Sequence, residues 1–164
     1  MHMKRNHVPI NIFKNPIHFL AFGLGSGLSP YAPGTAGTLA AVPLVWWMQH
    51  LSPSTYVLLT ALFFLLGIWL CHVTAKDMNE HDHSGIVWDE FVGYMITMFA
   101  VLLGWMWLFV GFLLFRFFDV VKPWPVSVLD KKVQGGLGIM LDDVMAGVYA
   151  WLVMWIAVYF MGAN

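Results

Sequence analysis

Long apolar runs separated by short polar segments dominate the chain. Four runs cover residues 38–50, 56–71, 91–115 and 144–161. The third run holds 25 residues without a charged side chain, which is long enough to cross a bilayer once with some tilt. The pattern therefore predicts helices that lie in a membrane.

The third run could be one helix or two. One straight helix would place Asp89 and Asp119 about 45 Å apart, at about 1.5 Å per residue, on opposite sides of a membrane. A hairpin that turns near Gly104 would instead hold two helices of about 18 residues, one from Ile86 and one ending near Lys122.

The distribution of charge favours the hairpin. In a five-span arrangement with this hairpin, all 8 Lys and Arg and all 9 Asp and Glu fall on one side. The opposite turns, near Ser52 and Gly104, and the tail at residues 162–164 carry none. Lys4 and Arg5 place the N-terminus with the charged side, so that side is expected to face the cytoplasm.

Two N-terminal segments are shorter than a full span. Residues 38–50 number only 13, which predicts a short or re-entrant helix. Residues 10–22 mix Lys14, Asn15 and His18 with apolar positions, so we expect an interfacial amphipathic helix there, although Pro16 interrupts it.

Composition supports a membrane protein and excludes other classes. The chain is 60% hydrophobic and 10% charged, whereas a soluble domain would be about a quarter charged. A net charge of −1 gives no broad attraction for nucleic acid, and a single cysteine excludes an internal disulfide framework. We expect one domain, residues 1–164, folded as an all-α polytopic membrane bundle of about four to five spans plus the interfacial helix.

Two acidic pairs precede apolar helices: Asp89 with Glu90, and Asp142 with Asp143. The helix macrodipole alone would favour acids at these positions, but capping needs only one of each pair. Ionisable groups at the edge of a span are costly unless they bind something. Four carboxylates at one face would repel one another unless a cation neutralised them, and Mg²⁺ suits such a site because it accepts carboxylates, waters and a substrate phosphate.

A basic motif, FRFFDVVKPWP, ends the predicted hairpin. Arg116 and Asp119 are three residues apart and could simply pair on one helix face. Lys122 follows on the next turn, before Pro123 stops the helix. Beside metal-binding acids, the Arg fork and the Lys point charge form a candidate phosphate clamp.

A glycine-rich segment precedes the first apolar run. Its sequence, GLGSGLSPYAPGTAGT, lets backbone N–H groups approach an anion at a helix N-terminus. No Gly-Lys-Ser/Thr follows, so it is not a Walker A loop, and a flexible connector is an equal alternative. Gly34 and Thr35 are the candidate backbone and hydroxyl donors to phosphate.

A second metal site is conceivable around Cys71, His72, His81 and His83. These residue types bind zinc, but their spacing matches no closed zinc motif. Asp82 or a histidine of this segment could instead assist proton transfer.

With these residues assembled, the chain resembles the phosphatidylglycerophosphatase A family of bacterial inner-membrane lipid phosphatases over nearly its whole length. The resemblance rests on four motifs in order: GLGSGLSPYAPGTAGTLAAVP, CHVTAKDMNEHDHSGIVWDEFVGY, FRFFDVVKPWPVSVLD and GGLGIMLDDVMAGV. It implies Mg²⁺-dependent removal of the terminal phosphate of phosphatidylglycerophosphate, leaving phosphatidylglycerol, at the cytoplasmic face. The family's conserved acids correspond to Asp89, Glu90, Asp119, Asp142 and Asp143, and its basic positions to Arg116 and Lys122.

These assignments give a mechanistic hypothesis. Mg²⁺ held by Asp89, Glu90, Asp142 and Asp143 would polarise the phosphomonoester and lower the pKa of a bound water. Arg116 and Lys122 would neutralise the phosphate oxygens. Asp119 would orient Arg116 or act as general base. Asp89 would be the fourth catalytic residue, beside Arg116, Lys122 and Asp119.

The sequence leaves three other functions open. A phosphatase for another lipid phosphate, such as phosphatidate, would need the same residues. An ion transporter would also carry membrane carboxylates, but it predicts acids near midspan or discontinuous helices, whereas these acids gather at one face. A non-catalytic scaffold would leave the four acids and two bases unexplained.

Overall fold

The computed structural model describes residues 11–80, 83–124, 133 and 135–161. Predictions that concern Lys4, Arg5, His81, Asp82 or the tail at 162–164 lie outside these residues.

The described residues form six α-helices and no strand, which confirms the all-α class. Two 3₁₀ turns, η1 (Ile12–Lys14) and η2 (Ser26–Leu28), flank the first helix. The α-helices are α1 (Pro16–Ala21), α2 (Pro33–Met48), α3 (Pro53–Met78), α4 (Trp88–Thr97), α5 (Trp105–Val121) and α7 (Gly136–Phe160).

Local sequence sets where the long helices begin and end. Proline occupies the first turn of α2 and α3, where its missing N–H has no helical partner to lose. The Ser52 hydroxyl caps α3 by accepting a hydrogen bond from the Thr55 N–H at 3.3 Å. Asn79 ends α3 in the left-handed region with φ 53°, a conformation that asparagine tolerates.

The predicted hairpin is present, with Gly104 between α4 and α5 at φ +146°. Its first arm was predicted too long: α4 has 10 residues, which is about 15 Å of helix, instead of about 18 residues. Helix α4 ends at Thr97, and Ala100, three residues further on, adopts φ +54°, a left-handed conformation through which an α-helix cannot continue.

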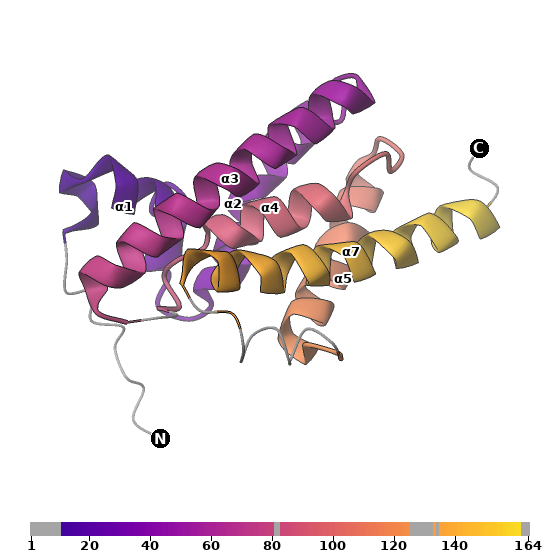
Figure 1. Cartoon of the computed structure of the whole chain (residues 1–164). Coiled ribbons are helices and arrows are strands. Elements are labelled where there is room, and N and C mark those ends of the chain that lie inside the picture. The colour runs from indigo at the N-terminus through magenta and orange to yellow at the C-terminus, as the bar shows by residue number, and fades with distance from the viewer. Residues whose placement is uncertain (1–10, 81–82, 125–132, 134, 162–164) are drawn as a thin grey trace.

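The hairpin brings the charged helix ends to one end of the bundle. The starts of α4 and α7 lie beside the end of α3, while the α2–α3 turn, the α4–α5 turn and the end of α7 lie at the opposite end (Figure 1). Asp89 and Asp119 therefore share one end, as the distribution of charge predicted.

Among the described residues, two helices are long and apolar enough to cross a membrane: α3 with 26 residues and α7 with 25. Both present large apolar side chains outward, including Leu62 and Leu65 on α3 and Trp155 and Ile156 on α7. The other helices have 16, 10 and 17 residues in α2, α4 and α5, fewer than the roughly 20 of a full span. Four to five spans are thus not confirmed.

The segment at residues 10–22 is not one amphipathic helix, which corrects that prediction. Asn15 separates η1 from α1, and its side chain accepts a hydrogen bond from the Ile17 N–H at 3.0 Å. His18 points into the protein rather than outward: it is buried and lies 3.0 Å from the Thr74 hydroxyl and 3.3 Å from Asp77 Oδ2. These contacts dock α1 on the end of α3.

Helix α4 lies at the centre of the bundle and packs most extensively on α7. A side chain at Gly147 would overlap the Gly93 carbonyl oxygen, and one at Gly93 would lie 2.8 Å from the Asp143 carbonyl oxygen. The two backbones can approach this closely only because both positions are glycine. Glu90 precedes Gly93 by one turn and Asp143 precedes Gly147 by one turn, so this crossing also sets the distance between their carboxyl groups.

The α4–α7 crossing gives the first prediction. Gly147→Ala adds one carbon where the Gly93 backbone already lies, so it should lower the free energy of unfolding by about 1–3 kcal/mol despite the better helix propensity of alanine. Thermal unfolding in detergent measures this change. Val153→Ile adds one carbon on an outward position of the same helix and should change stability by less than about 0.5 kcal/mol.

Candidate active site

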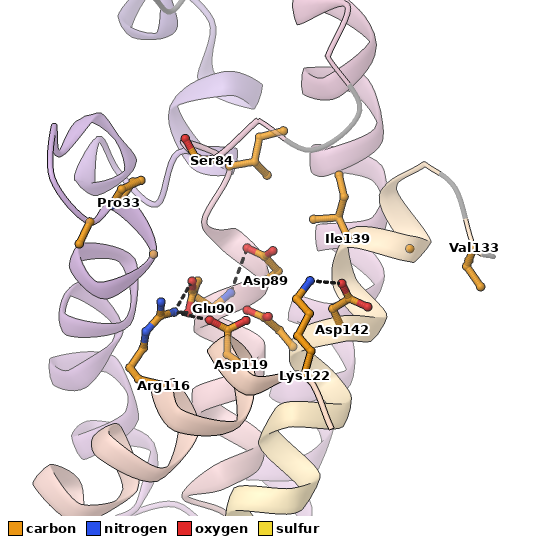
Figure 2. Close-up of a pocket in the computed structure, with 15 residues that line it drawn as sticks. Pro33, Ser84, Asp89, Glu90, Arg116, Asp119, Lys122, Val133, Ile139 and Asp142 are labelled. Atoms are coloured by element: carbon orange, nitrogen blue, oxygen red, sulfur yellow. Dashed lines mark hydrogen bonds and ion pairs between the residues drawn. The ribbon is translucent and has the colours of Figure 1, made fainter. Parts of the chain in front are cut away.

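A cavity of about 290 Å³ opens at the charged end of the bundle. Five carboxyl groups and two cations line it, with the start of α2 on one side and the segment before α4 on another (Figure 2). The lining residues are Ala32, Pro33, Gly34, Ser84, Ile86, Asp89, Glu90, Arg116, Asp119, Lys122, Val133, Gly138, Ile139, Asp142 and Asp143.

Two helices supply the four acids of the predicted metal site. Asp89 and Glu90 lie in the first turn of α4, where the macrodipole favours them, and Asp89 Oδ1 accepts a hydrogen bond from the Glu90 N–H at 3.1 Å. Asp142 and Asp143 do not begin their helix as predicted: they are the seventh and eighth residues of α7. Helix capping therefore does not explain the second acidic pair.

Arg116 is the centre of an ion-pair cluster. Its Nη1 lies 2.6 Å from both carboxylate oxygens of Glu90 and 2.8 Å from Asp119 Oδ2 (Figure 2). The Arg116–Asp119 pair, one of the two interpretations that their spacing left open, is thus present, and Glu90 joins it from α4. Their side chains are 19%, 15% and 9% exposed, so solvent screens these charges only weakly.

Burial shapes the chemistry of Glu90. Burial raises the pKa of the Glu90 carboxyl above its usual value, and the attraction of Arg116 offsets only part of that rise. The Thr38 hydroxyl also donates to Glu90 Oε2 at 2.8 Å, which favours the charged form. Arg116 from α5 and Thr38 from α2 therefore hold one buried carboxylate on α4.

Gly34 faces this cluster from the first turn of α2. A side chain there would overlap Glu90 Oε1 and would come within 3.0 Å of Arg116 Nη1 and 3.2 Å of Nη2. The position must be glycine for Glu90 and Arg116 to meet where they do. The second nitrogen of the guanidinium, Nη2, consequently lies near the N-terminal end of α2.

Lys122 forms the second ion pair of the site. It ends α5 in a left-handed conformation with φ 44°, and its Nζ lies 2.8 Å from Asp142 Oδ2 on α7. The turn after α5 thus directs this amine toward α7, across the cavity from Arg116 (Figure 2).

Asp143 is the most buried acid of the site. Its side chain is hydrogen-bonded to Asp119, and its Oδ2 is buried without a hydrogen-bond partner. A buried carboxylate oxygen that lacks a donor is costly, so this atom is suited to a cation. No three His, Cys, Asp or Glu side chains of the described chain are already arranged around a common metal position.

The structure brings together the seven charged residues predicted from the sequence, together with Gly34. Among the described residues, it does not place Thr35, His72 or His83 in the lining of the cavity. The described part of the chain supports no zinc site around Cys71, which is buried. The sequence analysis did not identify Thr38 as a site residue. Its only sequence signal is that a polar residue stands one turn after Gly34, at the start of an apolar run.

Comparisons with known proteins agree on one family. The family model of Phosphatidylglycerophosphatase A matches residues 19–158. Phosphatidylglycerophosphatase A of Escherichia coli K12 is 52% identical over 135 residues, covering 82% of this chain and 78% of that protein. The Haemophilus influenzae protein of the same name is 50% identical over 149 residues, covering 90% and 91%.

A more distant relative carries a different name. A Bacteroides thetaiotaomicron protein, provisionally named a phosphatidylinositol-3-phosphatase, is 41% identical over 149 residues, covering 85% of this chain and 92% of that protein. No solved structure matches the chain.

The buried Glu90–Arg116 pair gives the second prediction. Arg116→Met leaves the Glu90 charge buried without its main counter-charge, so it should lower the free energy of unfolding by about 3–5 kcal/mol. Adding Glu90→Gln removes that charge and should restore at least about 1 kcal/mol, as a double-mutant cycle in detergent measures.

The exposed Lys76→Met is the matched control, and it should change stability by less than about 0.5 kcal/mol. Additive effects of the two cavity substitutions would contradict the coupling of Glu90 with Arg116.

Proposed function

This chain belongs to the phosphatidylglycerophosphatase A family of phosphatases, and we propose that it hydrolyses phosphatidylglycerophosphate to phosphatidylglycerol and inorganic phosphate. In the net reaction a water oxygen bonds to phosphorus, the bond from phosphorus to the glycerol oxygen breaks, and that oxygen takes up a proton. One observation carries the proposal: a single cavity holds carboxylates and cations of the kinds that phosphomonoester hydrolysis needs.

We propose Asp89, Glu90, Asp142 and Asp143 as the residues that hold Mg²⁺. The donor set suits this ion, because carboxylate oxygens are its usual protein ligands. Five acids against two cations leave an excess of negative charge in the cavity, and Asp143 Oδ2 has no hydrogen-bond donor. When bound, Mg²⁺ would supply charge neutralisation at the phosphate and a lowered pKa for a coordinated water.

Arg116 and Lys122 are the proposed phosphate ligands. The hydrogen bonds and ion pair that join Arg116 to Glu90 and Asp119 involve Nη1. Nη2 lies beside it, so that a side chain at Gly34 would stand 3.0 Å from Nη1 and 3.2 Å from Nη2. One guanidinium can therefore stay anchored to the acids while its outer edge binds a phosphate oxygen. Lys122 would add a point charge from across the cavity.

The backbone around Gly34 and the Thr35 hydroxyl are proposed to complete phosphate binding. Gly34 lies in the first turn of α2, a 16-residue helix whose N-terminal N–H groups favour anions. Thr35 follows it in the same turn, although it does not line the cavity as the structure stands.

Asp119 is proposed as the residue that orients Arg116. It lies in the last turn of α5, and its Oδ2 lies 2.8 Å from Arg116 Nη1. Its hydrogen bond with Asp143 links the Arg116 cluster to α7. The alternative role, general base, would require Asp119 to leave this contact, so orientation fits the geometry better.

We propose a multi-pass protein of the bacterial inner membrane, with the cavity at the cytoplasmic face. The apolar surfaces of α3 and α7 support membrane residence, and the shared end of the charged groups supports a single chemical face. Helices α2, α4 and α5 would then line the bundle within the membrane without each crossing it fully.

The alternative function is hydrolysis of another lipid phosphate. The name of the Bacteroides relative favours including a phosphoinositide among the substrates tested.

Phosphate release provides the third prediction. Purified protein in detergent should release phosphate from phosphatidylglycerophosphate with Mg²⁺ and lose at least about 100-fold in rate when the metal is chelated. Phosphatidate and phosphatidylinositol 3-phosphate, measured in parallel, should be hydrolysed at least about tenfold more slowly. A preference for either would replace the proposed substrate and leave the phosphatase assignment intact.

The acids of the site provide their own test within that assay. Asp89→Asn and Asp142→Asn should each lower kcat by about 100-fold or more, because each removes a carboxylate from the proposed metal site. Asp77→Asn, an exposed acid outside the cavity, should retain activity. Full activity of both cavity variants would refute the metal-site assignment.

The fourth prediction concerns topology. In a Cys71→Ser background, cysteines placed at Ser54 and Glu80 lie beyond opposite ends of the apolar part of α3. A membrane-impermeant maleimide added to intact spheroplasts should label the cysteine at 54 and should label that at 80 only after permeabilisation. Labelling of both from the same side would exclude α3 as a span.

A further inference from the structure

Thr38 is a polar side chain at the back of the cavity that does not itself line it. It lies on α2 one turn after Gly34 and is fully buried. Its hydroxyl lies 2.8 Å from Glu90 Oε2 and 3.0 Å from the Gly34 carbonyl oxygen. Through these two atoms it connects the first turn of α2 with the acid that pairs with Arg116.

A hydroxyl has one proton, so Thr38 can donate to only one of these two acceptors at a time. Threonine in a helix often donates to the carbonyl four residues earlier, and that bond alone would give Thr38 no role in the site. The Gly34 carbonyl, however, already accepts the backbone N–H one turn on in the helix. The buried Glu90 carboxylate has the greater need of a donor, and a bond to a charged acceptor is the stronger one.

The contacts of Glu90 explain why its orientation matters. Both of its oxygens lie 2.6 Å from Arg116 Nη1, and Oε1 lies where a side chain at Gly34 would stand. A rotation of the carboxylate would move it out of this geometry and would shift the guanidinium, whose Nη2 is the proposed phosphate donor. Thr38 is the residue on α2 whose side chain resists that rotation.

We propose that Thr38 is a positioning residue of the active site, whose hydroxyl fixes the Glu90 carboxylate and thereby the Arg116 guanidinium. This proposal rests on the proposed phosphatase function for its consequence in catalysis. Thr38 touches neither the cavity nor the phosphate, so its effect passes through Glu90 and Arg116.

The experiment compares two substitutions at this position. Thr38→Val keeps the shape and removes the hydroxyl, whereas Thr38→Ser keeps the hydroxyl. Thr38→Val should lower kcat for the lipid phosphate by about 10- to 100-fold, the effect of one hydrogen bond to a charged group, with KM changed by less than about threefold. Thr38→Ser should stay within about threefold of the wild-type kcat.

Thr60→Val is the matched control. Thr60 is partly buried and also donates to the carbonyl four residues earlier, Tyr56, at 2.9 Å, but it lies on α3 and does not line the cavity. Its loss should keep kcat within about threefold even if it lowers the thermal midpoint as much as Thr38→Val does.

A second measurement does not depend on catalysis. Arg5 and Arg116 are the two arginines of the sequence, so phenylglyoxal modification at Arg116 can be followed by mass spectrometry and normalised to Arg5. Release of Arg116 from Glu90 should make Arg116 react several-fold faster in Thr38→Val than in the wild type, Thr38→Ser or Thr60→Val.

The outcomes separate the two proposals. Wild-type kcat and labelling in Thr38→Val, or equal impairment of the valine and serine variants, would overturn the role of Thr38. If the wild type releases no phosphate from any lipid tested, the proposed function fails, and the labelling ratio alone decides whether Thr38 positions Arg116.

Discussion

The close approach of α4 and α7 is the constraint on which the site depends. Gly93 and Gly147 let two helix backbones touch, and the acids one turn earlier on each helix are carried to the same place as a result. Side chains at either glycine would separate the helices and with them Glu90 and Asp143. A packing requirement in the core therefore has a direct consequence for the spacing of charged groups at its edge.

Once gathered, the charges stabilise one another only in part. Arg116 pairs with both Glu90 and Asp119, and Lys122 pairs with Asp142, all with N–O distances of 2.6–2.8 Å. The acids still outnumber the cations, and burial together with the charge of Asp119 raises the pKa of the Glu90 carboxyl above its usual value. Binding of a cation would relieve this repulsion, which is why we propose Mg²⁺ for the site.

The sequence predicted which charged residues come together more accurately than it predicted the bounds of the helices that carry them. The hairpin and the gathering of the acids at one end of the bundle were predicted from where charged residues can lie in an apolar chain. This constraint is strong because each charge placed within a membrane is costly. The ends of the helices were predicted less well: α4 ends early, at Thr97, and nothing in the residue type of Ala100 indicates the left-handed backbone that follows. Asp142 was expected at the start of a helix because the apolar run begins after it, but glycines and apolar residues from Gly136 onward extend α7 by nearly two turns. Thr38 could not be assigned, since its role depends on a contact with Glu90, 52 residues away.

The position of Asp142 and Asp143 along α7 also bears on the depth at which they would lie in a bilayer. From Val144 to Phe160 the helix has 17 residues, about 26 Å at 1.5 Å per residue, close to the thickness of the hydrocarbon layer of a bilayer. If that stretch fills the layer, Asp142 and Asp143 stand at the level where phospholipid headgroups lie. A lipid could then present its phosphate while its acyl chains stay in the membrane, and the enzyme would avoid the cost of extraction, about 0.8 kcal/mol for each methylene.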